Sequence, residues 1–155
     1  MKSEAIVILL NDLQDINTLK KGLNIAKNEE SSVLVLYVYE KEHYSLEDLL
    51  FFNNTLNKEK IKKDILKKVK ELGYNTEIAI LVYEEDSEDR ILAITKDNKK
   101  YKIIIPYHKE ITKRVISKVD EAIIIVKNSN LEIQNVAIIV DSLNDECIKL
   151  YKDKI

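Results

Sequence analysis

The sequence predicts an α/β protein, a three-layer sandwich in which helices cover both faces of a mainly parallel sheet. Six short runs rich in β-branched residues are mostly continuous rather than alternating, which is typical of strands buried on both faces of a parallel sheet. Segments with apolar residues at three- and four-residue steps lie between these runs and predict amphipathic helices. Strands that alternate with helices favour the α/β class.

The first half of the chain opens with a strand and a helix. Residues 5–10 are an uninterrupted apolar run, and apolar side chains then recur with helical spacing over residues 13–26. A second strand is expected at residues 33–39. Ser45 and Asp48 then form a candidate capping box ahead of the apolar residues 49–52, which begins a long helical insert.

The insert continues in a lysine-rich helix whose apolar positions span residues 61–72, and Gly73 stands where a helix commonly ends. The remaining strands and helices follow in alternation. Asp86 and Ser87 are candidate caps of the helix before the fourth strand. The expected strands are residues 76–83, 101–105, 122–126 and 136–140. One expected helix carries Ile91, Leu92 and Ile94, and another covers residues 109–118.

The end of the chain repeats its beginning. Residues 6–15 align without a gap on residues 136–145, and both segments consist of a strand, a polar turn and a helix start. We therefore divide the chain into an α/β domain at residues 1–128 and a strand–helix extension at residues 129–155 that resembles the start of a second copy. Either the chain belongs to a shortened tandem protein, or the tail adds one strand and one helix to the first domain.

Composition excludes several classes of protein. A length of 155 residues favours one domain, and 45% hydrophobic residues are enough for a core. A net charge of −2 gives no general attraction to nucleic acid or to an anionic membrane, so we expect neither as a partner. Residues 5–10 are too short an apolar run for a signal peptide, which favours a cytoplasmic location.

The sequence contains few of the residues that form phosphate loops, disulfides, metal sites or catalytic motifs. The only glycines, Gly22 and Gly73, lie too far apart to form a glycine-built phosphate loop. The single cysteine, Cys147, excludes an internal disulfide and a multi-cysteine zinc site. His43 and His108 have no matched carboxylate spacing, so we expect no metal site. No nucleophile motif is present, and we expect no catalytic residues and no enzymatic activity.

Three segments resemble the universal stress protein family. Residues 15–40 follow the family's first helix and second strand without a gap. Residues 85–108 resemble its run from a Gly-Asp-Pro turn through an Ile-Leu helix to a Met-Gly-Thr-His strand end. Residues 111–127 resemble its closing Val-Ala-Glu-Arg-Val-Leu helix and last strand. The resemblance covers residues 5–127 and rests on pattern and spacing.

This resemblance implies a five-stranded, mainly parallel sheet of the adenine-nucleotide α-hydrolase-like type, often in a dimer paired through the last strand. In members that bind ATP, an aspartate after the first strand and backbone after the second strand hold the adenine and ribose. A loop of the form Gly-x2-Gly-x9-Gly-Ser/Thr after the fourth strand holds the phosphates.

The sequence departs from that pattern at the phosphate site. Asn11 stands at the aspartate position, with Asp12 beside it, and Pro106 stands at the loop's first glycine. The glycine loop itself is missing between His108 and Ile111. Because such a loop presents consecutive backbone N–H groups, and proline has none, we expect no standard binding of ATP.

A remnant nucleotide site is the alternative, and its candidate residues are Asn11, Asp12, Val38, His108 and Lys113. Asn11 and Asp12 lie between a strand and a helix, where they either cap the helix and solvate the loop, the interpretation that we prefer, or form a remnant ribose contact. Val38 offers backbone to an adenine, or simply packs in its strand. His108 follows the fourth strand at the edge where open α/β sheets place ligands.

Lys113 belongs to a cationic group with Lys109 and Arg114, at the start of the helix that follows the fourth strand. This group is either an anion site near a helix N-terminus or an ordinary solvated helix face. The apolar residues 49–52 either pack in the core or meet a partner subunit.

The sequence thus predicts a non-enzymatic regulatory or stress-response module without a cofactor, acting as a homodimer or through a protein partner. The alternative is a divergent protein that binds AMP, ADP or ATP.

Overall fold

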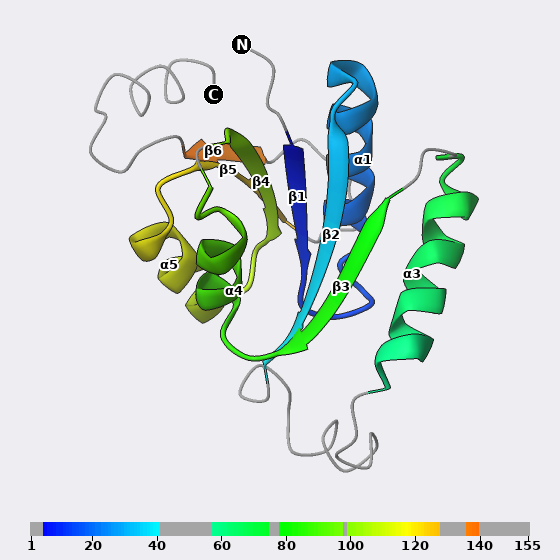
Figure 1. Cartoon of the computed structure of the whole chain (residues 1–155), viewed down its shortest axis with the longest axis horizontal. Coiled ribbons are helices and arrows are strands. Elements are labelled where there is room, and N and C mark those ends of the chain that lie inside the picture. The colour runs from blue at the N-terminus through cyan, green and yellow to red at the C-terminus, as the bar shows by residue number, and fades with distance from the viewer. Residues whose placement is uncertain (1–4, 41–56, 75–77, 98, 128–135, 140–155) are drawn as a thin grey trace.

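The computed structural model (Figure 1) describes residues 5–40, 57–74, 78–97 and 99–127, together with the backbone of residues 136–139. The expectations for His43, the capping box at Ser45 and Asp48, the apolar residues 49–52, the helix of the tail and Cys147 lie outside these residues.

Strands and helices alternate along the described chain, as the sequence predicts. The strands are β1 (Ala5–Leu10), β2 (Ser32–Tyr39), β3 (Ala79–Glu84), β4 (Tyr101–Pro106), β5 (Ala122–Val126) and β6 (Val136–Ile139). The helices are α1 (Ile16–Glu29), α3 (Lys58–Glu71), α4 (Ser87–Ile94) and α5 (Lys109–Lys118). Among the described residues, none of these helices is long and apolar enough to cross a membrane.

The strands form one sheet in the order β3-β2-β1-β4-β5-β6. The first five strands are parallel, which confirms the predicted five-stranded parallel sheet. The strand β6 pairs antiparallel with β5, with Ile124 opposite Ile138. The chain starts in the middle at β1, runs outward to β3, and returns to β4 on the other side of β1. The direction of winding therefore changes between β1 and β4.

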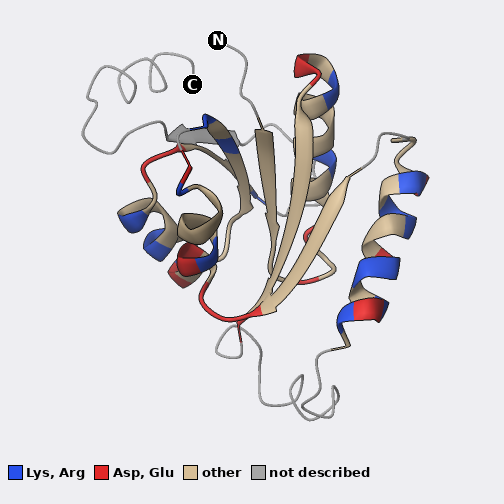
Figure 2. Cartoon of the chain, viewed as in Figure 1, with Lys and Arg blue, Asp and Glu red and all other residues tan. Residues whose placement is uncertain are grey.

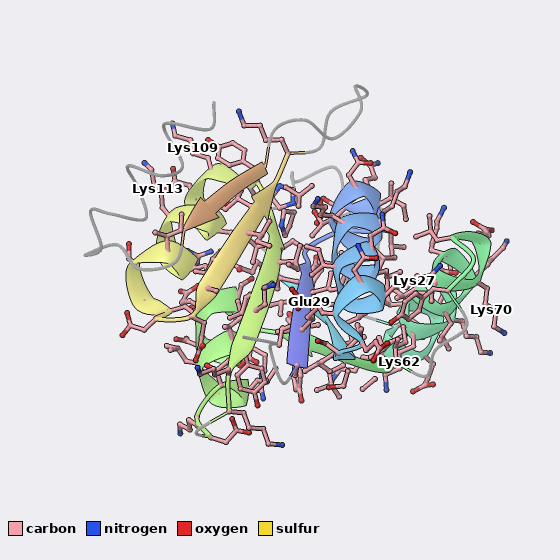
Figure 3. The ribbon with its side chains drawn as sticks, turned by 90° about the horizontal axis from the view of Figure 1, so that it is seen from above. Lys27, Glu29, Lys62, Lys70, Lys109 and Lys113 are labelled. Carbon is pink, nitrogen blue, oxygen red and sulfur yellow. The ribbon has the colours of Figure 1, made fainter. Side chains whose placement is uncertain are left out.

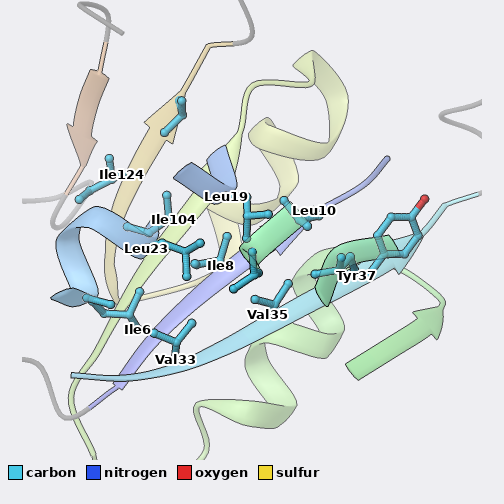
Figure 4. Close-up of a cluster of buried hydrophobic side chains, with 14 of the residues drawn as sticks. Ile6, Ile8, Leu10, Leu19, Leu23, Val33, Val35, Tyr37, Ile104 and Ile124 are labelled. Carbon is cyan, nitrogen blue, oxygen red and sulfur yellow. The ribbon is translucent and has the colours of Figure 1, made fainter. Parts of the chain in front are cut away.

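Helices cover both faces of the sheet (Figure 1). On one face, α1 packs against the alternate β1 residues Ile6, Ile8 and Leu10, and α3 packs against β3; side chains of both helices belong to the cluster drawn in Figure 4. On the other face, the remaining β1 residues Val7 and Leu9 belong to a second cluster with side chains of α4 and α5. Because successive strand residues point to opposite faces, a strand covered on both sides must be apolar at every position.

Both glycines have a structural role. A Cβ atom on Gly22 of α1 would lie 2.5 Å from Cδ1 and Cγ1 of Ile8, so this glycine allows the helix to approach β1 closely. Gly73 follows α3 with a φ of +79°, a left-handed conformation that ends the helix as its position predicts. At the other end of α3, the Asn57 side chain accepts a hydrogen bond from the N–H of Lys60 at 3.1 Å.

Candidate functional site

The polar groups of the sheet gather at the carboxyl ends of β1, β2 and β4. In an open α/β sheet this is the edge where ligands bind, next to the point at which the winding changes direction. Here that point lies between β1 and β4. The first turns of α4 and α5 reach the same edge, because each follows a strand that ends there.

A buried hydrogen-bond network connects the ends of β1 and β2 with the start of α4. The side chain of Asn11 is fully buried, and its Nδ2 donates to the carbonyl of Val38 at 3.1 Å and to Oγ of Ser87 at 3.0 Å. The Ser87 hydroxyl in turn donates to the carboxylate of Glu40, which also accepts the N–H of Ser87 at 3.0 Å. Ser87 was expected to cap α4 together with Asp86. It is instead hydrogen-bonded to Glu40, which directly follows β2.

Arg114 of α5 offsets part of the negative charge around this network. Its guanidinium donates to Glu40 and lies 3.5 Å from the carboxylates of both Asp86 and Glu88. Burial lowers the pKa of Arg114, but the hydrogen bond that it donates to Glu40 and the charges of Glu40, Glu88 and Asp86 raise the pKa by more, so the net shift is upward. Arg114 therefore keeps its positive charge.

Glu88 is only 2% exposed, and its second carboxylate oxygen, Oε2, has no hydrogen-bond partner within the part of the chain that the structure describes. Asp86 stands at the N-cap of α4, but its side chain makes no capping bond. The expectation that Asp86 and Ser87 cap this helix is therefore wrong in its detail, since the buried Glu40 carboxylate takes over that role for the N–H of Ser87.

A second group of polar side chains joins the ends of β1 and β4. Asp15 is fully buried, and its Oδ2 accepts the backbone N–H groups of Asn11 at 2.8 Å and Asp12 at 3.1 Å. The imidazole Nε2 of His108 lies 2.9 Å from Oδ1 of Asp15 and 3.9 Å from Oδ2 of Asp12. Two segments 93 residues apart are thereby brought together.

The connection from β4 to α5 is short and held by local hydrogen bonds. Only Tyr107 and His108 lie between the end of β4 and the start of α5. The Thr112 hydroxyl accepts the N–H of His108 at 3.0 Å and donates to the carbonyl of Pro106 at 3.2 Å. The backbone of His108 is therefore fixed on both sides.

Four of the five candidate nucleotide residues meet at this edge. Asn11 and Val38 are hydrogen-bonded to each other, and Asp12 and His108 lie at the ends of neighbouring strands. Lys113 is exposed on α5, and its neighbour Arg114 is the residue that reaches the network. Figure 3 shows Lys113 at the outside of the molecule.

Sequence reasoning missed Glu40, Glu88 and the role of Ser87. One signal was present, because Glu40 directly follows the apolar run of β2 and therefore lies at the carboxyl edge. The sequence also predicted no metal site. In the structure, donor atoms of Asp12, Asp15 and His108 all lie within 4.8 Å of one another.

Acidic residues outnumber basic ones along this edge, and Figure 2 shows them in red on the connection from β3 to α4. In that connection, Glu85 pairs with Arg90, whose guanidinium lies 3.6 Å from the centre of the Tyr83 ring. The hydrogen bond that Arg90 donates to Glu85 is the largest cause of its raised pKa. Both arginines of the edge are thus already paired with carboxylates.

These features define an α/β protein with a buried, acid-rich polar site at the switch point of its sheet. No protein-family model matches the sequence, and no match was found among curated proteins. Solved structures match over most of the chain. They show that it has the fold of the universal stress proteins, as its resemblance predicted.

Three of these structures illustrate the likeness. Universal stress protein UspA from Lactobacillus plantarum has 14% sequence identity and a TM-score of 0.60, covering 81% of this chain and 98% of its own. A universal stress protein in complex with cAMP has 12% identity and a TM-score of 0.59, covering 83% and 100%. The hypothetical protein MJ0577 has 23% identity and a TM-score of 0.56, covering 84% and 100%.

Proposed function

We propose that this chain is a universal-stress-protein-like regulatory module of the cytoplasm that is not an enzyme and does not bind ATP in the standard way. The observation that carries the proposal is the network of Asn11, Ser87, Glu40 and Arg114 at the carboxyl edge. In this network the polar groups at the ends of β1 and β2 bind one another.

Charge supports the proposal. A triphosphate brings several negative charges, and the edge already holds the buried carboxylates of Asp15, Glu40 and Glu88. The nearby guanidinium of Arg114 is paired with Glu40 and lies near Glu88. A nucleotide would have to compete with these carboxylates for the same cation, and the remaining carboxylates would repel its phosphates.

The short connection after β4 supports it independently. Phosphate loops bind by presenting several free backbone N–H groups around the anion. Here the connection has two residues, and the N–H of His108 donates to Thr112. Pro106, at the end of β4, has no N–H to offer.

Isothermal titration calorimetry of the purified chain with ATP and Mg²⁺, up to millimolar nucleotide, tests this proposal. We expect no saturable heat. The universal stress protein that was solved with cAMP, titrated with cAMP, serves as the positive control for the assay. Micromolar binding of ATP that requires Mg²⁺ would contradict the proposal.

A divergent nucleotide-binding protein is the second candidate function, and the relative in complex with cAMP favours it. A nucleotide with a single phosphate needs no triphosphate loop, and Lys109 and Lys113 lie at the start of α5 near the carboxyl edge. AMP and cAMP should then raise the melting temperature. Lys113→Ala should abolish that rise, whereas Lys118→Ala, at the other end of α5, should not.

Partners belong to the same proposal. We expect a homodimer or a complex with another protein, because a regulatory module without enzymatic activity must act through contacts. Analytical ultracentrifugation over a range of concentrations measures self-association, and a monomer at every concentration would leave a different protein as the expected partner.

A further inference from the structure

We propose that Asp12, Asp15 and His108 bind one divalent transition-metal ion, such as Zn²⁺, between the carboxyl ends of β1 and β4. This inference does not depend on whether the protein binds a nucleotide. It concerns the second polar group of the edge, which is separate from the network around Arg114.

The donor atoms lie at separations that suit one ion. Nε2 of His108 is 2.9 Å from Oδ1 of Asp15 and 3.9 Å from Oδ2 of Asp12. Zinc binds nitrogen and oxygen ligands at about 2.0–2.2 Å, so two ligands of one ion lie roughly 3–3.5 Å apart. Small side-chain rotations would bring all three atoms into one coordination sphere.

The chemistry of the set selects the class of ion. An imidazole nitrogen with carboxylate oxygens suits zinc, iron, nickel and related ions, whereas Mg²⁺ and Ca²⁺ prefer oxygen ligands alone. Two carboxylates balance the charge of a divalent cation. The ion would take the place of the proton that now joins His108 to the fully buried carboxylate of Asp15.

Surrounding hydrogen bonds already orient each donor. Oδ2 of Asp15 accepts two backbone N–H groups, which leaves Oδ1 directed at His108. Oδ1 of Asp12 accepts the N–H of Gln14 at 2.7 Å, and Oδ2 is the oxygen nearer to His108. The backbone of His108 is held by Thr112. Metal sites depend on such outer contacts to fix their ligands.

Location provides a separate argument. The crevice beside the strand at which winding reverses is where open α/β sheets bind ligands. Asp12 and Asp15 follow β1, and His108 follows β4, so the set joins the carboxyl ends of these two neighbouring strands. His108 and Asp12 are partly exposed, which leaves a path for an ion to enter.

The other carboxylate group of the edge lacks these properties. Donor atoms of Asp86, Glu88 and Asp89 also lie within 4.8 Å of one another. However, the guanidinium of Arg114 lies 3.5 Å from both Asp86 and Glu88, so this group already has a cation beside it. A cation is therefore expected at His108 and not at this group.

The test is titration of the chelator-treated full chain with Zn²⁺ by calorimetry and with Co²⁺ by visible absorption. We expect one equivalent to bind. His108→Gln and Asp12→Asn should each weaken binding about tenfold or more. The matched controls are His43→Gln, which removes the other histidine, and Asp89→Asn in the second carboxylate group, and neither should change the affinity.

His108→Gln keeps a group that can donate to Asp15, so circular dichroism should show an unchanged fold. In the unmodified chain, Zn²⁺ should shift the NMR signals of the His108 ring. The proposal is overturned if no saturable binding occurs at millimolar metal, or if binding survives in His108→Gln and is lost in His43→Gln.

Discussion

At the scale of single residues, Arg114 decides the charge balance of the carboxyl edge. Its guanidinium contacts Glu40, Asp86 and Glu88, two of which are almost completely buried. A buried carboxylate costs free energy unless it is paired or hydrogen-bonded. Arg114 therefore links α5 to the ends of β2 and the start of α4 through charge.

Replacing Arg114 by glutamine should lower the free energy of unfolding by roughly 1–3 kcal/mol, because Glu40 and Glu88 lose their cation. This loss is smaller than the loss expected on breaking a fully buried ion pair, because the Arg114 side chain is 34% exposed. Urea denaturation measures the change. Lys113→Gln, one residue away and exposed, should change stability by less than about 0.5 kcal/mol. Equal effects of the two substitutions would contradict this role.

Gly22 is the second residue whose identity the packing explains. Alanine there gains about 1 kcal/mol of helix propensity but places its Cβ 2.5 Å from Ile8, which is fully buried. Such overpacking costs about 1–3 kcal/mol, so Gly22→Ala should be net destabilising in thermal or urea unfolding.

A double-mutant cycle separates this clash from other effects of alanine. Ile8→Val removes Cδ1, one of the two atoms that the new Cβ would meet, so the pair should cost less than the sum of the single changes. Strict additivity would show that the clash is not the cause.

Gly73→Ala meets no atom within 4 Å, and its cost of about 1–2 kcal/mol should come from its positive φ alone.

At the scale of elements, the amino ends of β4 and β5 carry an unfavourable charge. Burial raises the pKa of Glu121, the residue before β5, and the charges of Asp120 and Asp97 add to the shift, against a hydrogen bond from Tyr101's backbone. A carboxyl group whose pKa is higher in the folded state binds protons more strongly there than when unfolded. Stability is therefore lost as pH rises from below its unfolded pKa through the folded value.

Glu121→Gln should therefore raise the free energy of unfolding at neutral pH by a few tenths of a kcal/mol, because the group is partly solvated. The gain should vanish at a pH below the ordinary pKa of glutamate, where the carboxyl group is neutral in both states. Urea denaturation at a series of pH values checks the sign. A gain that is independent of pH would mean that packing, and not charge, is responsible.

At the scale of the whole molecule, β6 occupies the outer edge of β5. The resemblance to universal stress proteins implied a dimer paired through that last parallel strand. Within one chain of this structure, the edge is already hydrogen-bonded to β6, so pairing with a second copy would require β6 to leave it. Whether the tail represents the start of a second domain stays a prediction.

Displacing β6 should therefore promote self-association. Proline at a position whose N–H bonds to β5 removes that bond and disfavours the pairing. Of Ala137→Pro and Ile138→Pro, one replaces an N–H that faces β5 and the other an N–H that faces away, so each serves as the control for the other. Sedimentation over a range of concentrations should show more dimer for one of them only. No change in either would mean that β6 does not control that edge.

The sequence by itself determined the succession of strands and helices and the fact that five strands run parallel. Side-chain periodicity is a local property, so a run such as residues 5–10 already records that β1 is covered on both faces. It also placed Asn11, Asp12, Val38 and His108 at one edge, because the carboxyl ends of parallel strands share that edge. Gly73 ended its helix as predicted for the same local reason.

Only the tertiary structure decided which side chains meet at that edge. Arg114 contacts Glu40 across 74 residues, and His108 contacts Asp15 across 93, while Lys113, equally basic, faces solvent. The apolar run of β6 likewise did not predict that this strand pairs antiparallel with β5. Such contacts depend on the order in which strands are placed and on the rotation of each helix, and the spacing of residues along the chain records neither.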